Sequence, residues 1–169
     1  MSHTAINPTT GETIATHADL TSPELRKVIA ATHRAFLRWQ QVPMHARADL
    51  MRAAARLLRE RAASFAELMA REGRGEAEKC AWVCEYYADL AASFLEPELI
   101  ATDASRSYVA YRPLGIIFAI MPWNFPFWQV FRFAAPALMG GNAGLLKHAP
   151  NVPGCALAIE QVFRDAGFP

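Results

Sequence analysis

The sequence predicts an α/β chain in which amphipathic helices precede the start of a Rossmann-like parallel sheet. Three segments support this class. Leu114–Met121 is an apolar run with the length and the β-branched and aromatic content of a buried strand. Phe127–Met139 has the apolar content of a buried helix, and Ala143–Leu146 has the pattern of a second interior strand. Strand, helix and strand in this order form a βαβ unit, whose strands are parallel.

Composition and charge narrow the classes of function. A length of 169 residues fits one domain or part of a larger one, and a hydrophobic content of 53% argues against disorder. The net charge of +1, from 17 basic and 16 acidic residues, gives no electrostatic support for nucleic-acid binding. Three irregularly placed cysteines and the lack of a signal peptide indicate a reducing cytoplasm.

The first 40 residues predict an irregular or short β lead-in followed by a helix. Turn signals at Asn7-Pro8 and Thr10-Gly11 mark the lead-in. Thr21 and Glu24 have the spacing of a capping box, so a helix is expected from there to about Gln40. The apolar face predicted for this helix consists of Leu25, Val28, Ile29, Thr32 and Phe36.

Two further helices are expected before the βαβ unit. One long pattern runs from Pro43 to about Gly73, with six arginines between Arg47 and Arg71 available to its polar face. Its apolar face consists of Leu50, Met51, Ala54, Leu57, Leu58, Phe65, Leu68 and Met69. The next helix runs from Glu76 to about Leu95, because small and apolar residues recur there at intervals of three and four.

The carboxyl half contains a short strand, the βαβ unit and a last helix. Side-chain polarity alternates well enough over Arg106–Arg112 to predict a strand. Pro126 suits the first turn of the crossover helix, and Gly140-Gly141 end that helix. The last helix, Pro153–Ala166, has proline near its start and glycine past its end.

The βαβ unit predicts a ligand site at one edge of its sheet. Pro122 ends the first strand, so Trp123 and Asn124 follow its carboxyl end, while Lys147 ends the second strand. The carboxyl ends of parallel strands lie at the same edge, about 4.8 Å apart for neighbours. Asn124 and Lys147 are therefore expected to face one ligand, at the edge where open α/β sheets bind ligands.

These residues also resemble a known family, the aldehyde dehydrogenase superfamily, in order and spacing. The motifs that carry the resemblance are Asn7–Glu12, Glu78–Cys84, Pro113-Leu114-Gly115, Pro122-Trp123-Asn124-Phe125-Pro126, Met121–Met139, Gly141-Asn142 and Lys147–Pro153. The chain is most similar to the amino-terminal portion of the succinate-semialdehyde dehydrogenases. The resemblance covers essentially the whole chain, and family chains are about three times as long.

The resemblance implies an NAD- or NADP-dependent oxidation of an aldehyde to a carboxylic acid, with succinate semialdehyde as substrate. It implies that the side-chain amide of Asn124 donates to the oxyanion and that Lys147 binds the adenine ribose. Other positions follow from the same resemblance: Ile120, Met121, Pro122, Trp123 and Asn124 along the cofactor groove, and Phe125, Trp128 and Gln129 along the substrate tunnel. It also implies a homo-oligomer in the full-length enzyme. No metal is expected, because the histidines and cysteines do not form the ligand pairs that a metal site needs.

By the same resemblance, the chain is a partial cofactor-binding domain in three parts. Residues 1–100 are a helical lead-in, 101–113 an oligomerisation-type strand and 114–169 a βαβα unit. No cysteine matches the family nucleophile, and the general base is expected beyond Pro169. We therefore expect an inactive fragment. With only two core strands and both crossover helices on one side, the isolated chain should expose apolar faces and associate.

Two departures from the family pattern concern the cofactor and a helix junction. Pro150 stands where NAD-preferring members often have a glutamate that binds the ribose hydroxyls. Without that carboxylate a 2′-phosphate is not repelled, so NADP becomes plausible, with His148 as a weak contributor. The junction Arg71–Glu76 is shorter than the usual family linker.

The residues alone leave other readings open. Asn124 could cap the following helix, Lys147 could be a solvated charge, and Trp128 could be a core residue. Cys80 and Cys84, one turn apart, could supply half a metal site, but no second pair of ligands is present, and core thiols are the more common case. Cys155, near the start of the last helix, lacks the neighbouring residues that surround the nucleophilic cysteine of the family.

Two functions from other classes also remain open. A membrane hairpin over Pro113–Leu146 would leave backbone groups unpaired around its prolines. A non-catalytic association module, or a truncated remnant that binds a partner, would bury the same helical faces.

Overall fold

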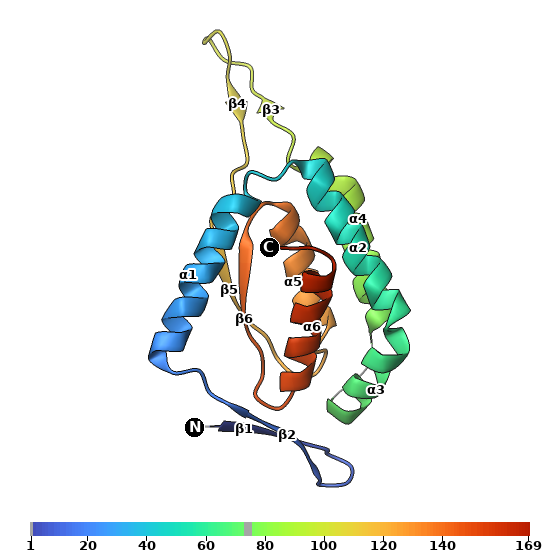
Figure 1. Cartoon of the computed structure of the whole chain (residues 1–169). Helices are drawn as coiled ribbons and strands as arrows, with labels where there is room; N and C mark the ends of the chain where they lie inside the picture. The colour runs from blue at the N-terminus through green and yellow to red at the C-terminus, as the bar shows by residue number, and fades with distance from the viewer. Residues whose placement is uncertain (1, 73–75) are drawn as a thin grey trace.

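The computed structural model describes residues 2–72 and 76–169 and confirms the α/β class. Three separate two-stranded sheets alternate with helices along this part of the chain (Figure 1). The elements are β1 Ser2–Ile6, β2 Thr13–Ala18, α1 Ser22–Trp39, α2 Met44–Glu60, α3 Ala62–Glu72, α4 Ala77–Phe94, β3 Glu98–Leu99, β4 Tyr108–Val109, β5 Ile116–Ile120, α5 Trp128–Met139, β6 Ala143–Lys147 and α6 Pro153–Asp165.

The predicted βαβ unit is confirmed in β5, α5 and β6. The two strands pair in parallel, with Ile116 opposite Ala143 and Ile120 opposite Lys147. Figure 1 shows α1 on one side of this pair and α5 and α6 on the other, and α1 contacts both strands. The two strands are therefore held between helical layers, with their carboxyl ends at a common edge.

The side chain of Asn142 ties together the starts of the two parallel strands. Its Oδ1 accepts the backbone N–H groups of Leu114 at 2.7 Å and Gly115 at 3.2 Å, and its Nδ2 donates to the carbonyl of Ala137 at 3.2 Å. A single amide thus connects the end of α5, the approach to β5 and the beginning of β6. These bonds fix the register of the pair at the edge opposite to the candidate site.

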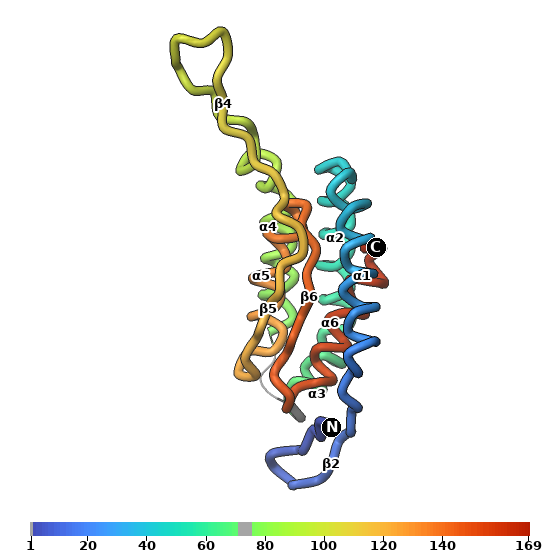
Figure 2. The backbone as a smooth tube through the Cα atoms, turned by 90° about the vertical axis from the view of Figure 1, so that its left-hand side faces the viewer, coloured from blue at the N-terminus to red at the C-terminus, as the bar shows by residue number. Residues whose placement is uncertain are grey.

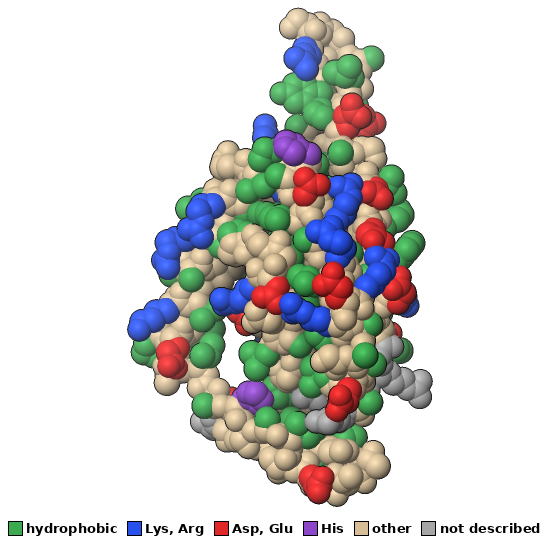
Figure 3. All heavy atoms as spheres, turned by 45° about the vertical axis from the view of Figure 1, so that its right-hand side comes forward, with side chains coloured by type: hydrophobic (Ala, Val, Ile, Leu, Met, Phe, Trp, Pro, Cys, Tyr) green, Lys and Arg blue, Asp and Glu red, His purple; other side chains and the backbone are tan. Residues whose placement is uncertain are grey.

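The first helix begins as predicted but buries less than predicted. Thr21 and Glu24 form the reciprocal capping box, with the Thr21 N–H donating to Glu24 Oε2 at 2.8 Å. Of the predicted apolar face only Phe36 is buried, because the first half of α1 stands away from the rest of the molecule and leaves an opening beside it (Figure 3). Trp39, which was not predicted to be buried, anchors the other end of the helix.

The prediction of a single long helix after Pro43 is wrong, because the chain forms two helices, α2 and α3. The break is at Arg61, whose backbone has φ −103° and ψ 12°. The turn directs α3 toward α6, where Arg61 pairs with Asp165 at 2.6 Å and Phe65 packs on Phe127 with ring centroids 5.0 Å apart. The predicted helix end at Gly73 and most of the junction before Glu76 lie outside the described residues.

The arginines of α2 are also not all on its outer face. Ion pairs such as Arg52–Asp89 at 2.7 Å and Arg59–Glu78 at 3.0 Å connect α2 to α4, and acidic and basic side chains alternate over this surface (Figure 3). Arg47 instead points inward and is only 8% exposed. This buried cation binds backbone carbonyls at the ends of two other helices, α1 and α5.

The strand expected over Arg106–Arg112 is much shorter in the structure. Only Tyr108–Val109 pairs, with β3, a strand that the sequence did not predict. Together they form a narrow arm that projects from the body (Figure 2). Leu99 is 73% exposed at its base, so the body does not cover the arm. Because neither face of this strand pair packs against the body, the ladder is limited to two residue pairs, Glu98 with Val109 and Leu99 with Tyr108.

The core joins α1, α3, α5 and α6 through a chain of aromatic contacts. Ring centroids are separated by 5.0 Å for Phe65–Phe127, 6.2 Å for Phe127–Phe131, 5.1 Å for Phe131–Phe163, 5.2 Å for Phe163–Phe168 and 5.0 Å for Phe168–Trp39. Phe127 and Phe131 are fully buried. The residue that ends the β5–α5 turn is thus locked into the core.

Candidate active site

The carboxyl ends of β5 and β6 form the edge on which the candidate residues gather. Ile120 lies directly opposite Lys147, and the Met121 N–H donates to the Lys147 carbonyl at 3.1 Å, so the pairing continues one residue beyond the strand. Ile120 is 69% exposed and Lys147 is exposed beside it. An apolar surface and an ammonium group therefore lie side by side at this edge.

The turn between β5 and α5 presents its middle residues to solvent. Pro122, Trp123, Asn124 and Phe125 are exposed, whereas Pro126 and Phe127 are buried. The buried pair anchors the turn, and the exposed residues follow directly after the end of β5. Trp123 is 55% exposed, so this turn carries a large uncovered aromatic surface three residues after Ile120.

Asn124 does not cap the following helix. The cap position of α5 is Phe127, with no side-chain hydrogen bond, and the Phe125 carbonyl accepts the Gln129 N–H at 3.0 Å. The helix begins at Trp128, so Pro126 lies in the turn before it and not in its first turn as predicted. The amide of Asn124 is consequently exposed at the edge and is not committed to the helix.

His148 does not extend toward a ligand at this edge, contrary to the weak role suggested for it. It is 8% exposed, and its Nε2 lies 2.9 Å from the Pro126 carbonyl oxygen. The imidazole therefore points into the protein, toward the turn between β5 and α5. Among the described residues of this region, Lys147 is the cation that the strand end presents.

Trp128 and Gln129 lie half-buried in the first turn of α5, the helix against which α4 packs. The ammonium of Lys79, on α4, lies 4.1 Å from the centroid of the Trp128 ring. Glu76, just before α4, has a buried Oε2 without a hydrogen-bond partner among the described residues, and burial raises the pKa of its carboxyl. Sequence reasoning missed both residues, because only tertiary packing brings them to Trp128.

The three cysteines do not contribute a nucleophile to this edge. Cys80, Cys84 and Cys155 are fully buried. Burial raises the pKa of the Cys84 thiol to about 12 and raises that of Cys80 further, with neighbouring negative charge adding to both shifts. Thiols of this kind carry almost no thiolate near neutrality. Within the described residues no group of three potential metal ligands is found.

A comparison with protein families decides the family. The model of the "Aldehyde dehydrogenase family" matches residues 2–169. The chain belongs to the aldehyde dehydrogenase family. This membership agrees with the fold class and with the position of the Pro122–Pro126 motif at a sheet edge.

Curated members of the aldehyde dehydrogenase family include close relatives of this chain. A probable succinate-semialdehyde dehydrogenase [NADP(+)] of Synechocystis sp. is 49% identical over an alignment of 176 positions, which covers 100% of this chain and 39% of the relative. Succinate-semialdehyde dehydrogenase [NADP(+)] 1 of Mycobacterium tuberculosis is 46% identical over an alignment of 174 positions, which covers 97% of this chain and 38% of the relative. The chain thus spans less than two fifths of these relatives.

Solved structures superpose on all or nearly all of the chain. A solved structure of Gox0499, which concerns cofactor and substrate selection by that protein, has a TM-score of 0.96 at 34% identity. The match covers 100% of this chain and 39% of the Gox0499 chain. Succinic semialdehyde dehydrogenase from Streptococcus pyogenes, in complex with NADP+, has a TM-score of 0.92 at 31% identity, covering 98% of this chain and 38% of its own. Among the described residues no helix has the length and apolarity needed to span a bilayer.

Proposed function

We propose that this chain forms the cofactor edge and the oxyanion donor of an enzyme that oxidises an aldehyde to a carboxylic acid, with NADP or NAD as cofactor and succinate semialdehyde as substrate. One observation carries the proposal. The register of β5 and β6 sets Ile120 opposite Lys147, with the Asn124 turn directly after β5. The names of the relatives from Synechocystis and M. tuberculosis support the substrate and the cofactor.

The residues at the edge fit a dinucleotide. The proposed apolar wall of the cofactor groove consists of Ile120, Pro122 and Trp123, which are exposed, and the half-buried Met121. The exposed Lys147 ammonium is the proposed donor to a ribose hydroxyl. When bound, the nicotinamide accepts the hydride that leaves the substrate carbon. Pro150 is exposed after β6 and brings no carboxylate to repel a 2′-phosphate, which favours NADP.

Asn124 is proposed to stabilise the oxyanion. When a thiolate adds to the aldehyde carbon, negative charge develops on the former carbonyl oxygen. The exposed side-chain amide of Asn124 is free of a helix-capping role, so its N–H₂ group can donate to that oxygen without first breaking a cap bond. The thiolate would have to come from a cysteine other than Cys80, Cys84 or Cys155, because these three are buried.

We propose that Phe125, Trp128 and Gln129 line the approach of the aldehyde. Phe125 is exposed in the turn, and Trp128 and Gln129 are half-buried on the helix that follows. They lie within five residues of Asn124, so a substrate tail could pass along this face of α5 while its carbonyl reaches the amide. Burial of the two methylene groups of succinate semialdehyde against the Phe125 and Trp128 rings would contribute to binding.

The arm of β3 and β4 is proposed to mediate homo-oligomer contacts. Tyr108 and Val109, like Leu99, are exposed on a two-residue ladder that the body does not cover. Apolar side chains on a projecting strand pair favour pairing with another chain, as exposed strand edges commonly do. The sequence alone also left open a non-catalytic association module. In the proposed enzyme, the arm would instead join copies of the same chain.

The proposal is tested with a chimera in which residues 1–169 replace the matching part of the Synechocystis relative. We expect NADPH formation from succinate semialdehyde by the chimera, and none by the 169-residue chain alone, because its three thiols are buried. Absorbance at the NADPH band measures both. A folded chimera with no activity beside an active parent relative would contradict the proposed function, and so would oxidation by the isolated chain.

A further inference from the structure

His148 is a buried polar residue directly after Lys147 whose role the proposed function leaves unexplained. Its Nδ1 accepts the backbone N–H of Ala149 at 2.8 Å, and its Nε2 lies 2.9 Å from the carbonyl oxygen of Pro126. The ring is 8% exposed, and Pro126 is fully buried. A contact of this kind between two segments 22 residues apart is not needed to form either strand or helix.

The two hydrogen bonds determine the tautomer of the imidazole. Because a backbone N–H can only donate, Nδ1 must present its lone pair and carries no proton. A carbonyl oxygen can only accept, so Nε2 must carry the proton and donate it to Pro126. The neutral Nε2–H form is therefore the one that satisfies both partners.

The Pro126 carbonyl is otherwise left out of the adjoining helix. In a regular helix the Val130 N–H would bond to the carbonyl four residues earlier, which is that of Pro126. Val130 instead donates to Phe127 at 3.1 Å, and Gln129 donates to Phe125 at 3.0 Å. His148 supplies a donor for this buried carbonyl, and leaving such a group without a hydrogen bond destabilises the folded state.

We propose that His148 is a positioning residue that fastens the 122–126 turn to the end of β6. The bond joins the segment that carries Asn124 to the segment that carries Lys147, so it sets the separation of oxyanion donor and cofactor. The catalytic part of this inference rests on the proposed function, whereas the ordering of the turn does not.

Three substitutions separate the two bonds of the ring. His148→Gln retains a donor at the Nε2 position, and His148→Asn retains only an acceptor at the Nδ1 position. The exposed His45→Asn is the matched control. In the 169-residue chain we measure ¹⁵N order parameters of the Trp123, Asn124 and Phe125 amides. We expect about 0.85 in the wild type, the control and His148→Gln, and less than about 0.6 in His148→Asn.

The same substitutions are then measured in the chimera. His148→Asn should lower kcat about ten- to hundredfold with a smaller change in KM for the aldehyde, because a displacement near 1 Å is enough for such a loss. His148→Gln should restore most of kcat. A merely structural role would not be rescued selectively by the residue that keeps the Nε2 donor.

Each outcome supports or overturns the inference. Wild-type order parameters and kcat in His148→Asn would overturn it, and so would equal losses in His148→Gln and His148→Asn. If His148→Asn does not fold, His148→Gln decides, since an ordered turn supports the inference and a disordered turn overturns it. An inactive wild-type chimera would contradict the proposed function, and the order parameters would still decide whether His148 holds the turn.

Discussion

Asn124→Ala in the chimera is expected to reduce kcat for aldehyde oxidation at least about a hundredfold, the usual loss when one oxyanion donor is removed. The amide lies exposed on the turn after β5 and does not cap α5, so its removal should leave the helix intact. In the proposed role, the Asn124 amide donates to the substrate oxygen only as negative charge develops there. KM should therefore change much less than kcat. Steady-state NADPH formation and far-ultraviolet circular dichroism measure these effects together.

The matched control for Asn124→Ala is Gln41→Ala, which removes another exposed side-chain amide at the end of α1. Its kcat should remain within about twofold of the parent chimera, since surface substitutions away from a site have small effects. If Asn124→Ala lost no more activity than Gln41→Ala, Asn124 would not be the oxyanion donor.

Arg47→Met is expected to lower the free energy of unfolding by about 3 kcal/mol, from two lost hydrogen bonds to a charged group. Arg47 Nη1 donates to the Met139 carbonyl at 3.0 Å, and Nη2 donates to the Gln40 carbonyl at 2.9 Å. Trp39 Nε1 donates to the neighbouring Leu138 carbonyl at 2.9 Å. The guanidinium thus binds the ends of α1 and α5, and burial lowers its pKa without neutralising it.

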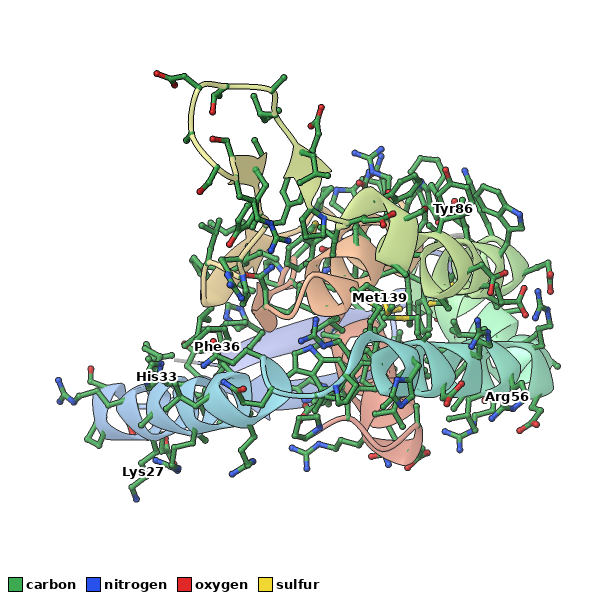
Figure 4. All side chains as sticks on the ribbon, turned by 90° about the horizontal axis from the view of Figure 1, so that it is seen from above. Lys27, His33, Phe36, Arg56, Tyr86 and Met139 are labelled. Carbon is green, nitrogen blue, oxygen red and sulfur yellow. The ribbon has the colours of Figure 1, made fainter. Side chains whose placement is uncertain are left out.

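Methionine fills a space similar to that of the Arg47 side chain but cannot replace its hydrogen bonds to the two helix ends. A Cβ at Gly141, where φ is +84°, would lie 2.9 Å from Nη1, so the guanidinium packs directly on the backbone that enters β6. Figure 4 shows Met139 near the centre of the molecule and Arg56 pointing outward from α2. Methionine offers no donor to either helix end, and both carbonyls would lose their partner.

Urea unfolding followed by circular dichroism measures the effect of Arg47→Met, with Arg56→Met as control. Arg56 lies on the same helix and is exposed, so its substitution should change the free energy of unfolding by less than about 0.5 kcal/mol. A loss below about 1 kcal/mol for Arg47→Met would show that the buried cation contributes little beyond its own desolvation cost.

The parts of the fold that depend on local pattern could be predicted. Pro122 ends β5 because it cannot donate to a ladder, and Thr21 with Glu24 starts α1 through a capping box. Parallel pairing then follows from the order strand, helix, strand. The candidate site could be placed for the same reason, since carboxyl ends of parallel strands share one edge.

The parts that depend on tertiary contacts could not be predicted. The break at Arg61 occurs because α3 packs toward α6, and a continuous apolar pattern does not reveal it. Arg47 has the same side chain as its exposed neighbours, and its inward direction follows from the carbonyls it meets. Lys79 and His148 are likewise defined by partners, Trp128 and Pro126, that lie far along the chain.

The central claim is that the cofactor binds at the carboxyl ends of β5 and β6. Its most direct test is calorimetric titration of NADP+ into the chimera and into the Lys147→Met variant of the chimera. Lys147 ends β6 opposite Ile120, and its exposed ammonium is the proposed donor to the ribose. Loss of one hydrogen bond from a charged group should raise Kd at least about tenfold, with Lys27→Met, an exposed lysine on α1, as control. Equal Kd values for Lys147→Met and the parent chimera would contradict the assignment of this edge to the cofactor.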